Sequence, residues 1–188
     1  MDWLTFGLER FVIVCIKDQQ ELPSIVSDWI GTAVVKIGPF LTAEQGLWLN
    51  YCAAVEDANP LYWRGSEETN FEPIAPPAML PSWVIDHHWN PNPTHKPLRT
   101  LELHFMLKDE FDLPFGVVTE VELEFHRPVK AGDQLRAEQV LVDVGDEYQT
   151  RMGLGRRWTI AVHYYHADDA LAGIQTLRFV SYRKEISS

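Results

Sequence analysis

Cysteines, basic side chains and long apolar runs are all scarce in this chain of 188 residues. Two cysteines cannot build a disulfide framework, so we expect a reducing, cytoplasmic compartment. Basic residues number 16 against 27 acidic ones, and the formal net charge is -11. That balance argues against the clustered Lys and Arg that hold a nucleic-acid backbone, so we expect no nucleic-acid partner. A single phosphorylated ligand is still compatible with it, because a few basic side chains in one place suffice.

The amino terminus carries one apolar run, at residues 11–16. A membrane-spanning helix needs roughly 20 apolar residues, so we expect no membrane span. No basic segment precedes the run, which is not typical of a secretory signal. Two interpretations stay open. The run packs on the domain as a short strand or helix, or residues 1–21 are an extension before a single domain at 22–188.

Repeats and clusters of metal ligands are also missing from the sequence. No group of His, Cys, Asp and Glu has the spacing of a metal site, so we expect no metal. What is present is an ordinary globular composition, 46% hydrophobic and 23% charged, in a chain long enough to bury one core.

The first half of the chain has helical spacing. Thr42 and Gln45 form a capping box, and apolar side chains recur every three to four residues from Trp48 to Val55. This helix should end near Glu56, because a proline follows shortly afterwards. A second, strongly apolar helix is predicted at 78–89.

A proline-rich segment connects the predicted helices to the last third of the chain. We interpret residues 90–115 as a long excursion with one short strand around 100–107. Four strands with alternating polarity follow, joined by hairpin-like connections at 128–133 and 167–170. Their predicted bounds are 117–129, 134–144, 158–166 and 171–183. Along the first strand, alternation places Val117, Thr119, Val121, Leu123 and Phe125 on one face.

Helices first and an antiparallel meander afterwards is an α+β layout, with one curved sheet wrapped on a buried helix. In this layout the stretch Asp57-Ala-Asn59-Pro60-Leu61-Tyr62 lies on a loop after the first helix. Asp-x-Asn-Pro by itself is most often a helix-ending turn, in which Asp and Asn bond their own backbone.

Four segments in order resemble the MaoC-like dehydratases, over about residues 25–184. They are YCAAVEDANPL at 51–61, PIAPPAML at 73–80, EFHRPVKAGD at 124–133, and GLGR at 153–156 with AGIQTLR at 172–178. The resemblance implies the hotdog fold, a curved antiparallel sheet wrapped around a long central helix. It also implies an acyl-CoA or acyl-carrier thioester as substrate, no further cofactor, and a homodimer or heterodimer with another hotdog chain.

The same resemblance assigns roles to the loop. Asp57 matches the family's catalytic acid and Asn59 the residue that organises the loop. Tyr62 stands where the family has the histidine that binds and activates water. Tyrosine has a reference pKa near 10, so at pH 7 it can donate a proton but is a poor base.

The start of the central helix departs from the family pattern as well. The family often reads Ile-Ala-His-Gly there, and the Gly N–H polarises the thioester carbonyl. Pro76 and Pro77 occupy these places here, and proline has no N–H. A slip of one residue would make Ala78 the donor.

Further substrate contacts are expected from aromatic and basic side chains. Trp83 and its neighbours could line a wide apolar pocket, although such aromatics are equally often dimer contacts. Arg156 and Arg157, with Arg151, form the best basic cluster for a cofactor phosphate. A solvated turn explains this cluster equally well.

Two departures in one site predict the substrate-accommodating, catalytically incomplete subunit of a two-subunit enoyl-CoA hydratase. Its substrate would be a bulky enoyl-CoA from lipid or steroid metabolism. One alternative is a self-sufficient homodimeric hydratase that uses Asp57 with Tyr62 or with His87 and His88. Another is a non-enzymatic module that binds acyl thioesters.

Overall fold

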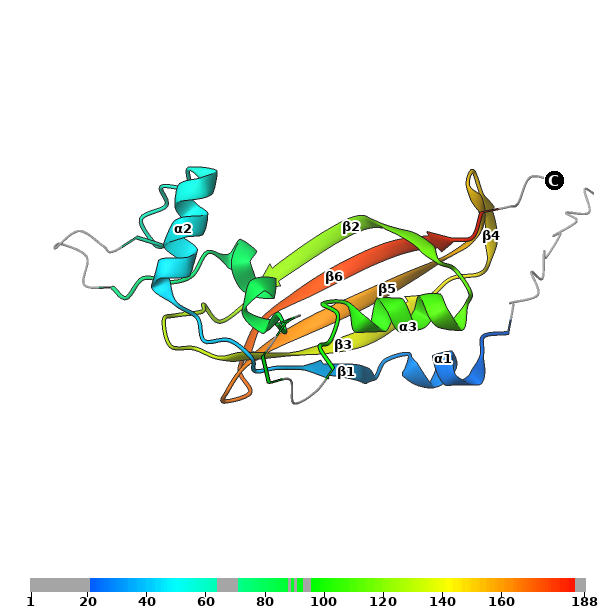
Figure 1. Cartoon of the computed structure of the whole chain (residues 1–188), viewed down its shortest axis with the longest axis horizontal. Helices are drawn as coiled ribbons and strands as arrows, with labels where there is room; N and C mark the ends of the chain where they lie inside the picture. The colour runs from blue at the N-terminus through cyan, green and yellow to red at the C-terminus, as the bar shows by residue number, and fades with distance from the viewer. Residues whose placement is uncertain (1–20, 64–70, 88, 90, 93–95, 185–188) are drawn as a thin grey trace, which may run out of the picture.

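The computed structural model describes residues 21–63, 71–87, 89, 91–92 and 96–184, and within them one curved antiparallel sheet runs the length of the molecule (Figure 1). The strand order is β1-β3-β5-β6-β2, and β4 pairs with β5. The strands are β1 (Ala33–Ile37), β2 (Phe115–Phe125), β3 (Leu135–Val144), β4 (Tyr148–Thr150), β5 (Gly153–His166) and β6 (Leu171–Tyr182). The helices are α1 (Ser24–Trp29), α2 (Gln45–Val55), the 3₁₀ helix η1 (Pro77–Val84) and α3 (Glu102–Glu110).

The amino-terminal alternatives fall on residues 1–20, which lie outside the described residues. The domain bounds therefore stay a prediction. No helix in the described part of the chain is long and apolar enough to cross a membrane.

All four predicted strands are confirmed, but the faces of β2 were predicted wrongly. A bulge between Val118 and Glu120 makes Thr119 an extra residue opposite β6. Val117 therefore shares a face with the glutamates that follow it. The inner side of the sheet, where Leu177 and Phe179 of β6 are buried, instead receives the β2 side chains Val118, Val121, Leu123 and Phe125.

The connections between the strands agree only in part with the predicted antiparallel meander. The hairpin at 167–170 is confirmed, because β5 and β6 are paired neighbours. The hairpin at 128–133 is wrong, since β2 pairs with β6 whereas β3 lies between β1 and β5. The turn at 128–133 instead carries the chain from β2, at one edge of the sheet, to β3, which lies next to the other edge strand β1. Within it, the Lys130 N–H donates to the Asp133 carboxylate (2.8 Å), and Gly132 takes a φ of 91°.

The first predicted helix is confirmed as α2, but its capping box is wrong. Glu44 is the residue at the N-cap, and no side chain caps the helix. The Thr42 hydroxyl instead accepts a hydrogen bond from the Gln134 side chain (3.0 Å). This bond joins the segment just before α2 to the residue just before β3. The helix ends where Glu56 turns left-handed, with a φ of 56°.

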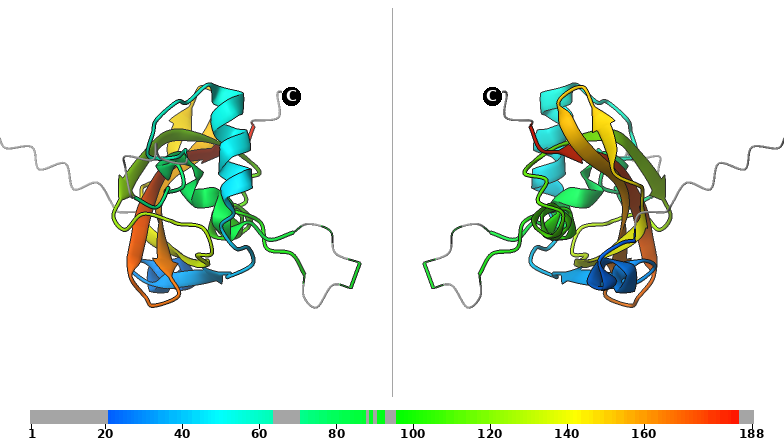
Figure 2. Two further views of the ribbon diagram at one scale, coloured as in Figure 1. Left: turned by 90° about the vertical axis from the view of Figure 1, so that its left-hand side faces the viewer. Right: turned by 90° about the vertical axis from the view of Figure 1, so that its right-hand side faces the viewer.

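The helix predicted at 78–89 is shorter than expected. It forms as the 3₁₀ helix η1, which contains Pro81 and ends at Val84, where Ile85 becomes extended. The short strand predicted around 100–107 is wrong, since this stretch forms α3. Figures 1 and 2 show η1 and α3 on the same side of the sheet.

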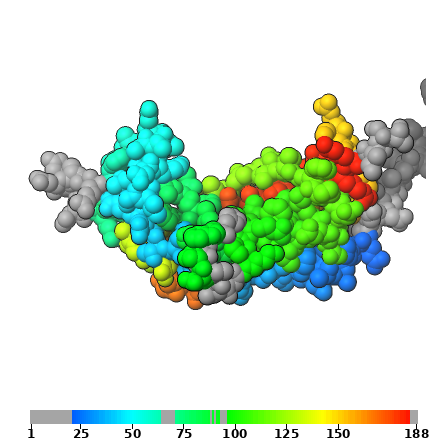
Figure 3. Space-filling model, in the orientation of Figure 1, coloured from blue at the N-terminus to red at the C-terminus, as the bar shows by residue number. Residues whose placement is uncertain are grey.

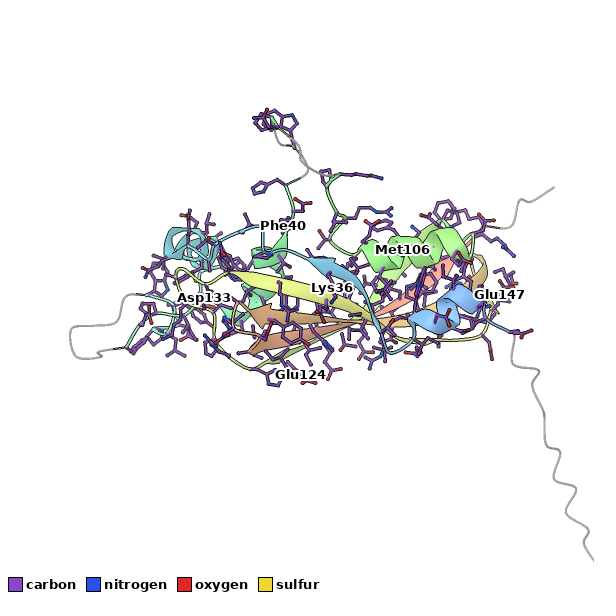
Figure 4. All side chains as sticks on the ribbon, turned by 90° about the horizontal axis from the view of Figure 1, so that it is seen from below. Lys36, Phe40, Met106, Glu124, Asp133 and Glu147 are labelled. Atoms are coloured by element: carbon purple, nitrogen blue, oxygen red, sulfur yellow. The ribbon has the colours of Figure 1, made fainter. Side chains whose placement is uncertain are left out.

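The described residues of the 85–101 connection project away from the sheet. Figure 4 shows this projection on the side opposite the labelled Glu124, while the labelled Met106 of α3 lies close to the sheet. At its base, the Leu98 N–H donates to the buried carboxylate of Asp86 (3.0 Å). One hydrogen bond thus closes the projection where it leaves the core.

Tryptophan and leucine side chains from helices and strands together make the core between the two layers. Its largest fully buried hydrophobic members are Trp48, Trp83, Trp158, Phe179, Leu80, Leu103, Leu107, Leu113, Leu135, Leu141 and Ile160. α3 adds a titratable group, His104, which is buried and stacks on Phe179 with 4.2 Å between ring centroids. The indole N–H of Trp158 donates to its Nδ1 (3.2 Å).

His104 should make the fold sensitive to mild acid. Burial, with smaller contributions from Lys108 and Arg99, lowers the pKa of His104 to about 4. Since the unfolded chain takes up the proton near pH 6.5, the free energy of unfolding falls as the pH drops from 6.5 towards 4. We expect a His104→Phe variant to lose about 2 kcal/mol less than the parent between pH 7 and pH 5. Urea titrations at both pH values measure this, and equal losses in the two proteins would contradict it.

Candidate functional site

The loop after α2 is built by its own polar side chains. The Asp57 carboxylate accepts the N–H of Asn59 (2.9 Å), and the Asn59 side-chain oxygen accepts the N–H of Leu61 (3.1 Å). The Asn59 carbonyl then accepts the N–H of Tyr62 (3.0 Å). These are consecutive side-chain turns, so the sequence motif shapes the backbone here as a helix-ending turn would.

One indole group joins this loop to α2 and a second closes the loop on itself. Trp48 of α2 donates to the Tyr62 carbonyl and Trp63 donates to the Asp57 carbonyl, each over 2.9 Å. The Leu61 carbonyl accepts the N–H of Ile74 (3.0 Å). The loop is therefore joined to the segment that leads into η1.

Tyr62 occupies the place of the family's histidine in a setting that keeps it protonated. Burial and the negative charge of Asp57 raise the pKa of the Tyr62 phenol, and a hydrogen bond with the Asn59 side chain only partly opposes them. A phenol with a raised pKa cannot accept a proton from water at neutral pH. Asp57 and Tyr62 can position a water molecule, and Tyr62 can donate a proton.

The start of η1 offers few free donors. Pro76 is buried and Pro77 half-buried, and neither has an N–H. The preceding N–H, that of Ala75, donates to the Val129 carbonyl (2.8 Å). Ala78, the alternative donor, is exposed at the first turn.

A small apolar cavity of about 60 Å³ lies where η1 meets the carboxyl end of β2. It brings together three of the predicted substrate contacts, Pro76, Pro77 and Trp83. Asp57, Asn59 and Tyr62 are not in its wall. Its remaining lining comes from Ile74, Ala75, Leu80, Phe125, His126, Arg127, Pro128, Val129 and Ala172.

Trp83 connects the cavity with the loop. Its ring meets that of Trp48 edge to face, with 6.5 Å between centroids and 86° between planes. Trp48 in turn holds the Tyr62 carbonyl. Loop and cavity are thus neighbours joined through two buried indoles.

The predicted arginine pair lies elsewhere. Arg156 and Arg157 start β5, beside β4, and Figure 1 places β4 at the opposite end of the molecule from α2. Arg156 is buried, donates to the Gly145 carbonyl (2.8 Å) and lies 4.6 Å from the centre of the Phe111 ring. Arg157 is exposed and covers the ring of Tyr148. The structure does not bring this pair to the cavity, and phosphate binding by it stays a prediction.

The alternative in which Asp57 acts with His87 and His88 expected both histidines on a helix. His87 is exposed and lies beyond the end of η1, so it is not on a helix as the sequence suggested. His88 lies outside the described residues. Among the residues that the structure does describe, no group of three or more His, Cys, Asp or Glu could hold a metal ion.

Sequence reasoning missed half of the cavity wall. Phe125, His126, Arg127 and Ala172 come from β2, the turn after it and β6. The segment EFHRPVKAGD was noticed only as a strand and turn. Its spacing from η1 in the sequence gives no sign that the two meet.

Comparisons with known proteins agree with this fold. Residues 47–171, about two thirds of the chain, match the family described as FAS1-like, dehydratase domain region. A probable enoyl-CoA hydratase alpha subunit from Thermomonospora curvata is 26% identical over 140 residues. That match covers 71% of this chain and 43% of the relative, so the chain spans less than half of the relative's length.

A solved structure with a TM-score above 0.5 shows a similar architecture. The ChsH1-ChsH2 complex from Mycobacterium tuberculosis contains a chain that matches with a TM-score of 0.62 and 21% identity, over 82% of this chain and 86% of that one. A C-terminally truncated HadBC (3R-hydroxyacyl-ACP dehydratase) complex from the same organism matches with a TM-score of 0.48 and 17% identity, over 78% and 94%. The chain therefore belongs to the FAS1-like dehydratase domain family and has the MaoC-like hotdog fold.

Proposed function

We propose that this chain is the substrate-accommodating, catalytically incomplete subunit of a two-subunit enoyl-CoA hydratase. The observation that carries this proposal is the loop at 57–62. Hydration needs a base that takes a proton from water, and the raised pKa of Tyr62 denies it that role. The prolines at the start of η1 remove the usual backbone donor to the thioester oxygen.

A partner chain is supported by the exposed edge of β2. This strand of 11 residues pairs with β6 on one side, and no described strand pairs with its other edge. Long, exposed, apolar edge strands are a hazard in monomers, because they template pairing with another chain. Val117, Val121 and Phe125 are each about half exposed along it. Another hotdog chain that continues the sheet would cover this edge.

The short length of η1 supports a bulky acyl group. Leu80 of η1 packs at Gly173 of β6, and His104 of α3 stacks on Phe179 of β6. Val118 and Val121, on the inner face of β2, remain about half exposed. Figure 3 shows a recess over this region, between the part formed by α2 and the end formed by the β4–β5 turn. An apolar surface beside the cavity suits a long or polycyclic acyl chain.

The test is an assay of the chain alone and with its cognate hotdog partner. We expect negligible hydration of crotonyl-CoA or a steroid enoyl-CoA by the lone chain, and activity on adding the partner. Tyr62→His should raise the lone chain's activity, because it restores a group that titrates near neutral pH. Val117→Lys, on the outer face of the edge strand β2, should weaken the response to the partner.

Two other results would contradict the proposal. Strong hydration by the lone chain that Asp57→Asn abolishes would refute the proposal and favour a self-sufficient hydratase. Binding of acyl-CoA with no hydration, even beside an active hotdog partner, would instead indicate a binding module.

A further inference from the structure

One buried donor at the cavity lacks an acceptor. Trp83 is 2% exposed and its ring is part of the cavity wall. Its indole Nε1 is buried and hydrogen-bonds to no described atom. Buried polar groups in folded proteins almost always have a partner, so an orphan at a ligand-sized space needs a reason.

No described acceptor pairs with this N–H. Trp48, its edge-to-face neighbour, offers only a ring and an N–H that already donates to Tyr62. The other wall residues of η1 and its N-cap, Pro76, Pro77 and Leu80, have apolar side chains. A ligand in the cavity can therefore supply the acceptor.

Other donors around the cavity are already used. The prolines of the wall have no N–H at all. Four further backbone N–H groups donate to backbone carbonyls: Ile74 to Leu61, Ala75 to Val129, His126 to Ala172 and Arg127 to Leu171. The wall's two charged or titratable side chains are also engaged, His126 with Glu124 and Arg127 with Asp168. The indole N–H of Trp83 is thus a donor of the cavity wall without an acceptor among the described residues.

We propose that the indole N–H of Trp83 donates a hydrogen bond to an oxygen of the bound acyl group. This inference rests on the proposed function, since it takes an acyl thioester as the ligand. The thioester carbonyl and a hydroxyl on the acyl chain share the required chemistry, an oxygen acceptor on an otherwise apolar group. Trp83 thus binds and selects substrate, and it replaces part of the donor capacity that Pro76 and Pro77 lack.

The test uses three CoA probes and a near-isosteric variant of the full chain. The three share the CoA moiety and differ in the group on sulfur, which carries a carbonyl in butyryl-CoA, only a hydroxyl in S-(3-hydroxybutyl)-CoA, and neither in S-butyl-CoA. We expect Trp83→Phe to weaken one or both oxygen-bearing probes by about tenfold and to leave S-butyl-CoA unchanged, as measured by calorimetry. The probe that loses affinity identifies the oxygen. Trp89→Phe, a change at an exposed tryptophan, is the matched control and should bind like the parent.

The outcomes separate the two proposals. If the parent binds all three probes and Trp83→Phe changes none, or weakens all equally, the hydrogen bond is refuted while the proposed function stands. If the parent binds neither these probes nor a steroid enoyl-CoA, alone or with its partner, both fall. Should the variant fail to fold, the ¹⁵N–¹H signal of the Trp83 indole in the parent decides. A downfield proton shift with an oxygen-bearing probe but not with S-butyl-CoA supports the bond, and no shift with any bound probe overturns it.

Discussion

Replacing Gly173 by alanine should lower the free energy of unfolding by about 3 kcal/mol or more. Gly173 lies on β6, opposite Phe125 of β2. A Cβ atom there would come within 2.5 Å of the Glu124 carbonyl oxygen and 2.6 Å of a methyl carbon of Leu80. The carbonyl belongs to the backbone of β2 and cannot rotate away, so either β2 or η1 must move. Chemical denaturation followed by tryptophan fluorescence measures the loss.

Gly46 provides the control with the opposite sign. It lies inside α2, and a Cβ added there would meet nothing within 4 Å. Gly46→Ala should therefore stabilise the protein by roughly 0.5–1 kcal/mol, because alanine is the better helix former. If Gly173→Ala were as harmless as Gly46→Ala, the close approach of β2 and η1 at β6 would be wrong.

The Gly173 contact matters for the site as well as for stability. Leu80 and Phe125 both line the cavity, and both pack at Gly173. The same small residue lets β2 and η1 approach each other closely enough to form the cavity. A displaced η1 would also move Trp83. Weakened acyl-CoA binding is thus expected to accompany the lost stability.

How far the sequence predicts the fold depends on whether local or distant contacts decide each element. The four long strands were predictable, because alternation is a local pattern that a half-buried strand imposes, whereas the short strands β1 and β4 were missed. The full face assignment of β2 was not predictable, since the bulge at Thr119 depends on how β2 pairs with β6. The early end of η1 was also hidden, because Pro81 permits either a delayed start or an early end.

The candidate site also has one part that the local sequence encodes and another that tertiary packing decides. The turn at Asp57 and Asn59 is encoded by their own side chains, so sequence reasoning found it. The cavity joins η1 to residues 125–129 through tertiary packing, and no spacing rule connects them. For Arg156 the error is different, because the sequence suggested a site residue that the fold places away from the cavity. A cluster of arginines is visible in the sequence, whereas its burial against Phe111 depends on the fold.

α3 shows most clearly how one distant side chain can set local structure. Gln139 of β3 is fully buried, at 0% exposure. Its side-chain oxygen accepts the N–H of Leu103 (2.9 Å), and its amide donates to the carbonyl of Thr100 (3.0 Å). One amide thus satisfies two backbone groups where α3 begins. The Leu103 N–H would otherwise be buried without a partner, and nothing near residues 100–107 in the sequence reveals this.

Gln139→Leu should therefore lower the free energy of unfolding by about 1–3 kcal/mol. Leucine keeps most of the side-chain volume, so the loss comes mainly from leaving the buried Leu103 N–H without a partner, whereas the carbonyl of the exposed Thr100 can bond water. Gln134→Leu is the matched control, because that exposed side chain makes one hydrogen bond to Thr42 and its loss should stay within about 0.5 kcal/mol. Hydrogen exchange at the Leu103 amide should also accelerate in Gln139→Leu but not in Gln134→Leu. Equal stability and unchanged exchange in Gln139→Leu would mean that packing alone, without this amide, holds α3 on the sheet.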